Sequence, residues 1–140
     1  MIAHTWSVLC DKTIVDQDSK NISLDVVEQI AARGLPEAPP ESLLLLPFRP
    51  IIVSLWYRDQ PDRPATGEAR IIFLSPTGAM LGTFDLAIDL TTAERCRTKL
   101  ELPGLPVSTS GRYLFDVELR REGEWDRVAR IPLQVILEGR

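Results

Sequence analysis

Residues 111–135 constrain the fold more than any other stretch, because they have the pattern of two long strands joined by a short turn. Apolar side chains occupy every second position of the first strand, from Tyr113 to Leu119. A period of two places these side chains on one face, and alternation over residues 129–137 continues that face in the second strand. A hairpin with so long an apolar face needs a second layer to cover it.

The rest of the chain supplies that layer as further strands. Short segments with alternating or β-branched apolar residues are separated by turns rich in Gly, Pro, Asp and Ser. They occupy residues 5–15, 22–26, 51–58, 69–74, 84–90 and 96–102. The segment 51–58 is apolar on both faces, which indicates a central strand. Together with the final hairpin, this predicts an all-β, antiparallel β-sandwich of about eight strands, formed as a single domain by residues 1–140.

Residues 31–50 interrupt the pattern with prolines at positions 36, 39, 40, 47 and 50. Proline lacks a backbone N–H and restricts the residue before it, so neither a long helix nor a central strand fits this segment. We predict a long loop rich in proline and leucine, in which residues 42–46 form either a helical turn or a short strand. A connection of this length in a compact domain is often functional.

Composition and charge narrow the classes of function. The net charge of −4 argues against a nucleic-acid-binding surface built on bulk positive charge. No apolar run approaches the length of a membrane span, and no signal-peptide pattern opens the chain. We therefore expect a cytoplasmic protein that binds neither nucleic acid nor membrane. Its two cysteines, Cys10 and Cys96, are expected to stay reduced in that compartment.

Two local features resemble the immunoglobulin-like sandwich. The approach to Tyr113 resembles a tyrosine corner, in which a Tyr at the start of a strand bonds back to upstream backbone. Trp56 lies in an all-apolar strand, as the core Trp of such domains does. Phe115 stands where an antibody-type domain has its second cysteine, so the resemblance is to the architecture. It implies an immunoglobulin-like sandwich without the inter-sheet disulfide.

At a finer grain the chain resembles a family of short bacterial proteins of unknown function. The first hairpin shares with that family the residues Cys10-Asp11, Ile14-Val15-Asp16, Lys20 and Ser23-Leu24. The final hairpin shares Gly111, Tyr113 and Phe115. These are turn and core positions, so the resemblance implies a fold and no particular activity.

Residues for catalysis or metal binding are sparse. His4 is the only histidine and has no partner close in the sequence, so we predict a protein without catalysis and without a cofactor. Asp16 and Asp18 are oxygen ligands in one turn. If every strand crosses the sandwich once, that turn shares an end of the molecule with Asp59, Asp62 and Asp89. A calcium-binding module is therefore a weaker alternative, as is a carbohydrate-binding module that uses exposed tryptophans.

The opposite end is nearly uncharged and rich in leucine. Those leucines either fold over the core as a lid or form an apolar surface for a protein partner. The predicted partner surface consists of Leu35, Leu43, Leu44, Leu45, Leu46 and Leu105. Pro132 cannot donate a ladder hydrogen bond, so the last strand is predicted to lie at an edge or to carry a bulge. We expect a structural or protein-interaction module that binds a protein partner or forms a homo-oligomer.

Overall fold

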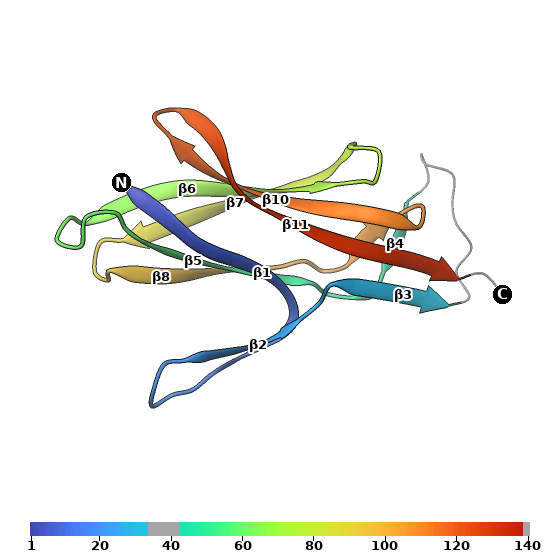
Figure 1. The fold of residues 1–140 in the computed structure, drawn as a ribbon, viewed down its shortest axis with the longest axis horizontal. Helices are drawn as coiled ribbons and strands as arrows, with labels where there is room; N and C mark the ends of the chain where they lie inside the picture. Colours follow the sequence, from blue (N-terminus) through green and yellow to red (C-terminus); the bar gives the residue numbers. More distant parts are fainter. Residues whose placement is uncertain (34–42, 139–140) are drawn as a thin grey trace.

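The computed structural model describes residues 1–33 and 43–138, in which eleven β-strands and no helix are present. Two larger sheets face each other, and a small two-stranded sheet lies at one end (Figure 1). Within the described ranges no helix is therefore long and apolar enough to cross a membrane. The prediction of an all-β fold is confirmed.

The strand order defines three sheets. Sheet A contains, from edge to edge, β2 (Ile22–Val26), β1 (Ile2–Val15), β5 (Ile51–Arg58) and β8 (Arg95–Glu101). Sheet B contains β3 (Gln29–Arg33), β11 (Glu124–Glu138), β10 (Gly111–Arg121), β6 (Ala65–Leu74) and β7 (Met80–Leu90). The small sheet pairs β4 (Leu44–Leu46) with β9 (Leu105–Val107).

The final hairpin has the predicted register. β10 and β11 pair in antiparallel fashion from Gly111 opposite Val135 to Arg121 opposite Glu124. Glu122 and Gly123 have φ of 51° and 81°, which is the backbone of a two-residue hairpin turn whose twist matches that of the strands. The alternating residues Tyr113 to Leu119 are buried on the inner face of sheet B, as the period of two predicts.

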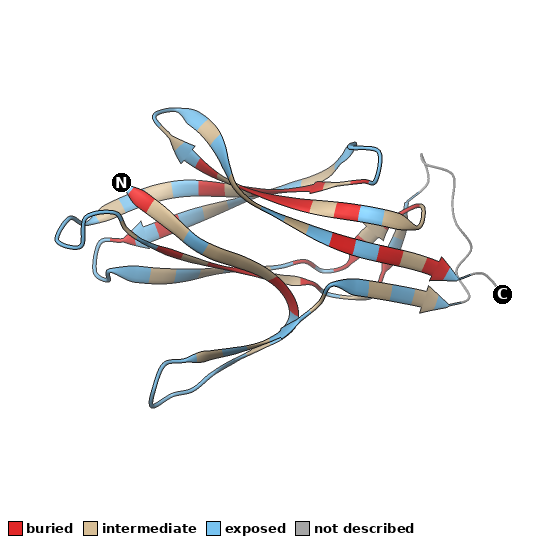
Figure 2. Cartoon of the chain, in the orientation of Figure 1, coloured by how far each residue is buried: buried red, intermediate tan, exposed pale blue. Residues whose placement is uncertain are grey.

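The core lies between the two large sheets, where Figure 2 shows the buried residues concentrated. Sheet A contributes the fully buried Trp56, whose indole N–H donates to Thr98 Oγ1 at 2.9 Å. In sheet B, Phe73 stacks between Tyr113 and Phe115 at ring-centroid distances of 5.5 and 4.6 Å. The inward positions of Tyr113, Phe115 and Trp56 are as the sequence predicts.

Tyr113 also makes the predicted bond to upstream backbone. Its hydroxyl donates to the carbonyl of Thr109 at 2.8 Å and accepts from the backbone N–H of Ser108 at 3.1 Å. Ser108 is buried, so the tyrosine hydroxyl satisfies backbone groups that water does not reach. This contact fixes the path of the loop that leads into β10.

The strand count and direction differ from the prediction in one region. Residues 29–33 and 44–46 form strands, so the segment predicted as one long loop over residues 31–50 contains β4 and the end of β3. β3 pairs with β11 in parallel, from Gln29 opposite Gln134, so sheet B is mixed rather than purely antiparallel. These strands are only five and three residues long, so their alternation is too short to identify them in the sequence.

Pro132 lies where the outer edge of β11 is bare. β3 reaches β11 only at residues 134–138, and β11 carries an irregularity opposite Val117 and Glu118. The register shift agrees with the predicted bulge, whereas β11 lies between β3 and β10 and is not the last strand of sheet B. A proline at an exposed strand edge also discourages unwanted pairing.

β1 divides its length between two partners. Its first part pairs with β5, ending at Cys10 opposite Ile51, and its second part pairs with β2, from Cys10 opposite Val26 onward. The register shifts between Cys10 and Lys12, and an inserted residue bends a strand. Residues 11–26, named the arm from here on, leave the plane of sheet A as a projecting hairpin (Figure 1).

Candidate binding surfaces

The arm carries exposed aliphatic side chains. Ile14, Val15 and Val26 are 60%, 47% and 56% exposed, although all three stand on paired strand positions. Figure 2 shows the arm almost without buried residues. A two-stranded hairpin is marginally stable by itself in water. Neighbouring strand residues point to opposite faces, so Ile14 lies on one face of the arm and Val15 and Val26 lie on the other. The arm therefore presents exposed aliphatic side chains on both faces of a projecting element.

The turn at the tip of the arm is held by Asp16. Its Oδ1 accepts hydrogen bonds from the backbone N–H groups of Asp18 at 2.8 Å and Ser19 at 3.1 Å. These two donors lower the pKa of the Asp16 carboxyl, the bond from Ser19 contributing most. Lys20 completes the turn with φ of 64°. The carboxylate therefore caps its own turn.

The predicted gathering of aspartates with Asp16 and Asp18 is absent from the described ranges. No group of three or more His, Cys, Asp or Glu side chains that could hold a metal ion is present there. The bend at Cys10 turns the arm away from the strands of sheet A, so the assumption that each strand crosses the sandwich once is wrong for the second part of β1. Asp89 instead bonds Thr91 in its own turn.

The predicted leucine surface is divided by the structure. Leu46 and Leu105 pair across β4 and β9 and are 2% and 0% exposed, so they belong to the core. Leu44 is half-buried against the same core. Leu43 and Leu45 are 49% and 69% exposed, and they carry what remains of the surface. Leu35 lies outside the described residues.

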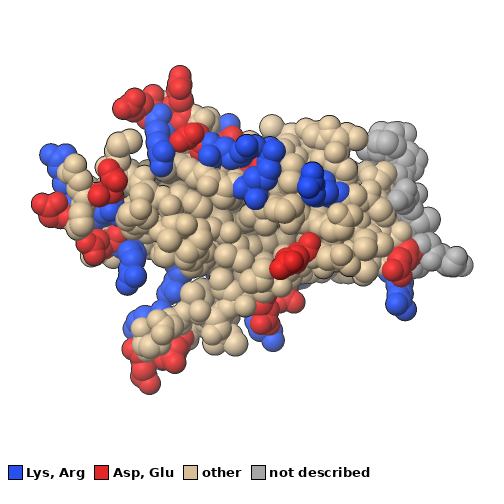
Figure 3. All heavy atoms as spheres, in the orientation of Figure 1, with Lys and Arg blue, Asp and Glu red and all other residues tan. Residues whose placement is uncertain are grey.

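Charge separates the two ends of the molecule. Figure 3 shows acidic and basic side chains gathered at the end that carries the N-terminus and at the tip of the arm, whereas the end near β3 and β4 is mostly uncharged on this face. The sequence predicted a charged end and a neutral end.

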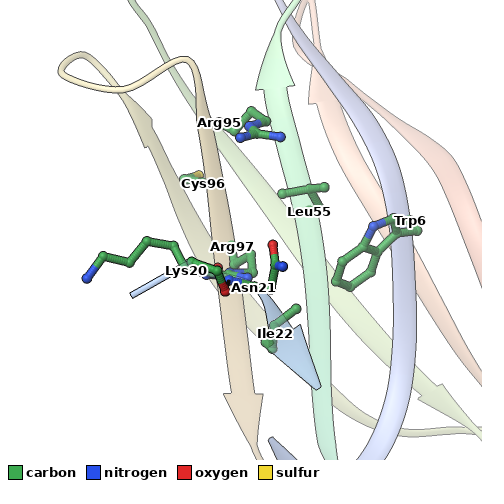
Figure 4. A pocket seen from close by; sticks show the side chains of 9 residues that line it. Trp6, Lys20, Asn21, Ile22, Leu55, Arg95, Cys96 and Arg97 are labelled. Carbon is green, nitrogen blue, oxygen red and sulfur yellow. Dashed lines mark hydrogen bonds between the residues drawn. The ribbon is translucent and has the colours of Figure 1, made fainter. Parts of the chain in front are cut away.

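Beneath the arm, a half-open cavity of about 700 Å³ separates residues 19–22 from the outer face of sheet A. Trp6, Leu55 and Ile22 supply apolar walls. Lys20, Arg95 and Arg97 supply cationic side chains. Figure 4 shows the Trp6 ring and Asn21 directed toward the space, with Arg95 at its upper end and the Lys20 side chain extending outward.

Strand pairing explains why these side chains share one face. Leu55 is paired with Trp6 on one side and with Arg97 on the other, and directly paired residues lie on the same face of a sheet. Trp56, the next residue along β5, is in the core, so the row of Leu55 faces outward. One contact ties the arm to this face, since Arg97 Nη2 donates to the Lys20 carbonyl at 3.3 Å.

The outer face of sheet B is charged in a different way. Arg130 donates to both carboxylate oxygens of the buried Asp116, at 2.7 and 2.8 Å, and this bond raises the pKa of Arg130. Arg70 bonds Glu118 at 2.6 Å and lies 4.2 Å from the centre of the Trp125 ring. Each of these two arginines is therefore paired with a carboxylate, and Arg70 also lies against an aromatic ring.

His4 has a partner that the sequence did not show. Its Nε2 lies 2.7 Å from Ser7 Oγ, which lies 2.6 Å from Ser54 Oγ. The register shift between His4 and Trp6 inserts Thr5 as an extra residue, so His4 and Ser7 face the same way although three positions separate them. Burial, aided by the charge of Arg121, lowers the pKa of His4. Ser54 is 0% exposed, so these groups satisfy one another at the edge of the core.

Both cysteines are free thiols, Cys10 buried and Cys96 half-buried. Burial is the main cause that raises the pKa of each thiol. Raised pKa values keep the thiols protonated and slow to react. The expectation of reduced cysteines agrees with this geometry.

No protein-family model matches this chain, and no curated protein matches its sequence. The candidate surfaces therefore stand on their geometry. Sequence reasoning missed the arm cavity, because Arg95 and Arg97 look like ordinary outward residues of an alternating strand until the arm lies over them.

Proposed function

We propose that this chain is a non-catalytic, immunoglobulin-like interaction module of the cytoplasm that binds a protein through its arm. The observation that carries the proposal is the exposure of Ile14, Val15 and Val26 on a projecting hairpin. β2 is also the last strand of sheet A, so its outer edge has no partner strand among the described residues. A partner strand added there gains backbone hydrogen bonds and apolar contacts together.

The hydrophobic free energy of the exposed arm residues favours their burial against a partner protein. Fully burying an aliphatic side chain stabilises by roughly 1.5–3 kcal/mol, and Ile14 and Val26 each keep more than half of their surface in water. The first partner to test is a second copy of the chain. In an antiparallel pairing of two β2 strands centred on Leu24, Ile22 faces Val26 and Ser23 faces Asp25 of the copy, so no like charges oppose each other.

The immunoglobulin-like assignment rests on the tyrosine bond and the core. Tyr113 bonds back to Ser108 and Thr109 at the start of β10, and the fully buried Trp56 lies in a central strand of the facing sheet. The non-catalytic assignment draws support from His4, whose imidazole is engaged with Ser7 and Ser54 at the edge of the core. The free thiols agree with a reducing compartment.

The test compares the oligomeric mass and the captured partners of three folded variants. Ile14→Asp changes the arm, Leu45→Asp changes the neutral end, and Met80→Asp changes a residue of similar exposure on β7 as a control. Sedimentation velocity measures self-association, and affinity capture from an extract of the cells that make the protein measures other partners.

The expected result is an assembly that Ile14→Asp dissolves and Met80→Asp leaves intact. If Leu45→Asp also dissociates the assembly, the neutral end belongs to the contact surface as well. A wild-type chain that stays monomeric and captures no specific protein would overturn the proposal. So would an Ile14→Asp variant that keeps every partner.

A further inference from the structure

We infer that the cavity under the arm binds a small organic anion that carries a flat ring, of the class of aryl or nucleoside phosphates. The inference is separate from strand addition at the outer edge of β2, because it uses the side of the arm that carries Ile22 and the outer face of sheet A. The volume of the cavity, about 700 Å³, lies within the range of roughly 300–1,000 Å³ typical of small-molecule sites.

The charge of the cavity selects an anion. Lys20, Arg95 and Arg97 line it, and no Asp or Glu is among its lining residues. None of the three forms a salt bridge in the part of the chain that the structure describes. The chain has a net charge of −4, so this concentration of positive charge is local. Guanidinium groups that have no carboxylate partner present their fork of N–H donors to phosphate or carboxylate oxygens.

The apolar wall selects a flat ring. Trp6 is half-buried, and Figure 4 shows its indole directed into the cavity opposite Asn21. Leu55 and Ile22 complete that wall. A flat ring that stacks on an indole gains about 1–3 kcal/mol, and the Asn21 amide offers both donors and an acceptor. The apolar wall of the cavity can therefore contact the ring of the ligand, while the cationic side chains bind its anionic group.

Among the described residues, one side-chain hydrogen bond joins the arm to the sheet beneath it. Arg97 Nη2 donates to the Lys20 carbonyl at 3.3 Å, which is long for a hydrogen bond. Residues 19–22 form the roof, and the outer row of sheet A forms the floor. An anion held between Arg95 and Arg97 would sit below that roof and add contacts between arm and sheet.

The experiment measures binding of 1-naphthyl phosphate by titration calorimetry. Two further probes dissect it, since 1-naphthol keeps the ring without the anion and inorganic phosphate keeps the anion without the ring. We expect each to bind at least tenfold more weakly than 1-naphthyl phosphate. Adenosine monophosphate against adenosine repeats the comparison with a nucleoside ring.

The variants test the named residues. We expect Arg95→Gln with Arg97→Gln to weaken 1-naphthyl phosphate binding by at least tenfold, and Trp6→Ala to weaken it by several-fold. Arg112→Gln, an exposed arginine of sheet B, should leave it unchanged. Circular dichroism confirms that each variant is folded. Absence of saturable binding, equal affinity for 1-naphthol, or equal losses in the double variant and in Arg112→Gln would each overturn the inference.

Discussion

The two outer faces of this sandwich use arginine in opposite ways. On sheet B, Arg130 and Arg70 are bound to Asp116 and Glu118. On sheet A, Arg95 and Arg97 stand on the same face of one edge strand without a carboxylate partner among the described residues. Both faces belong to one small domain of net negative charge, so the difference reflects placement rather than composition.

The two faces differ in whether their charged side chains are shielded from water. Asp116 is 6% exposed, and a polar group that is shielded from water is costly to bury unless hydrogen-bonding or charged partners replace the water. Arg95 and Arg97 are exposed, so water and salt can solvate them without a carboxylate partner. Sheet B therefore uses its arginines for the fold, whereas sheet A leaves two arginines free for another molecule.

The largest effect on stability is expected on sheet B. Asp116→Ala removes both acceptors of Arg130, and hydrogen bonds to charged groups contribute roughly 1.5–3 kcal/mol in such cases. Because the Arg130 side chain is 42% exposed and can be solvated after the loss, we expect a destabilisation of about 1–2 kcal/mol.

Urea unfolding measures the effect, and Asp85→Ala provides the control. Asp85 is an exposed acid on β7 of the same sheet, so its removal should change stability by less than about 0.5 kcal/mol. Equal effects of the two substitutions would show that the Asp116 pair does not stabilise the fold.

The dependence of stability on pH is expected to come from His4, which lies at the edge of the core and on neither outer face. His4 is the only histidine, and burial lowers its pKa below the ordinary 6.5. The unfolded chain therefore binds a proton before the folded chain does, so stability is full above pH 6.5 and is lost as pH falls from there toward the folded pKa.

The expected measurement is a lower unfolding free energy at pH 5.5 than at pH 7.5. In His4→Gln, which keeps a polar group opposite Ser7, the difference between these two pH values should shrink. An unchanged difference in this variant would assign the pH dependence to groups other than His4.

The smallest effect is expected on sheet A. Replacing Arg95 and Arg97 together by Gln should change the unfolding free energy by less than about 0.5 kcal/mol, because exposed and unpaired side chains contribute little. A slight gain would follow from the removal of like charges on one face. Thermal unfolding checks this, and a loss comparable to that of Asp116→Ala would contradict the contrast between the faces.

Much of this contrast could not be predicted from the sequence. Alternation places Tyr113, Phe115 and Trp56 correctly, because a strand period of two depends only on local geometry. The tyrosine bond is also local, since residues 108–113 are close in the chain. The parallel pairing of β3 with β11 joins residues more than a hundred positions apart, and no local pattern encodes it.

The candidate surfaces were harder still to predict. The leucine run was identified, but alternation along β4 buries Leu46 and exposes Leu45, a division that requires knowing the pairing with β9. The arm was predicted as a hairpin, yet its departure from sheet A depends on one inserted residue between Cys10 and Lys12. The cavity follows from that bend, so it appears only in three dimensions.

The most direct test uses the three tryptophans as reporters in one titration. Trp6 lines the cavity, Trp56 lies in the core, and Trp125 lies beneath Arg70 in sheet B. In a ¹⁵N-correlated NMR spectrum each indole N–H gives its own signal. With 1-naphthyl phosphate, we predict a saturable shift of the Trp6 signal while the Trp56 and Trp125 signals stay in place. A shift of Trp125 with Trp6 unmoved, or no shift of Trp6 at saturating concentration, would contradict the assignment of the free arginines to a binding site.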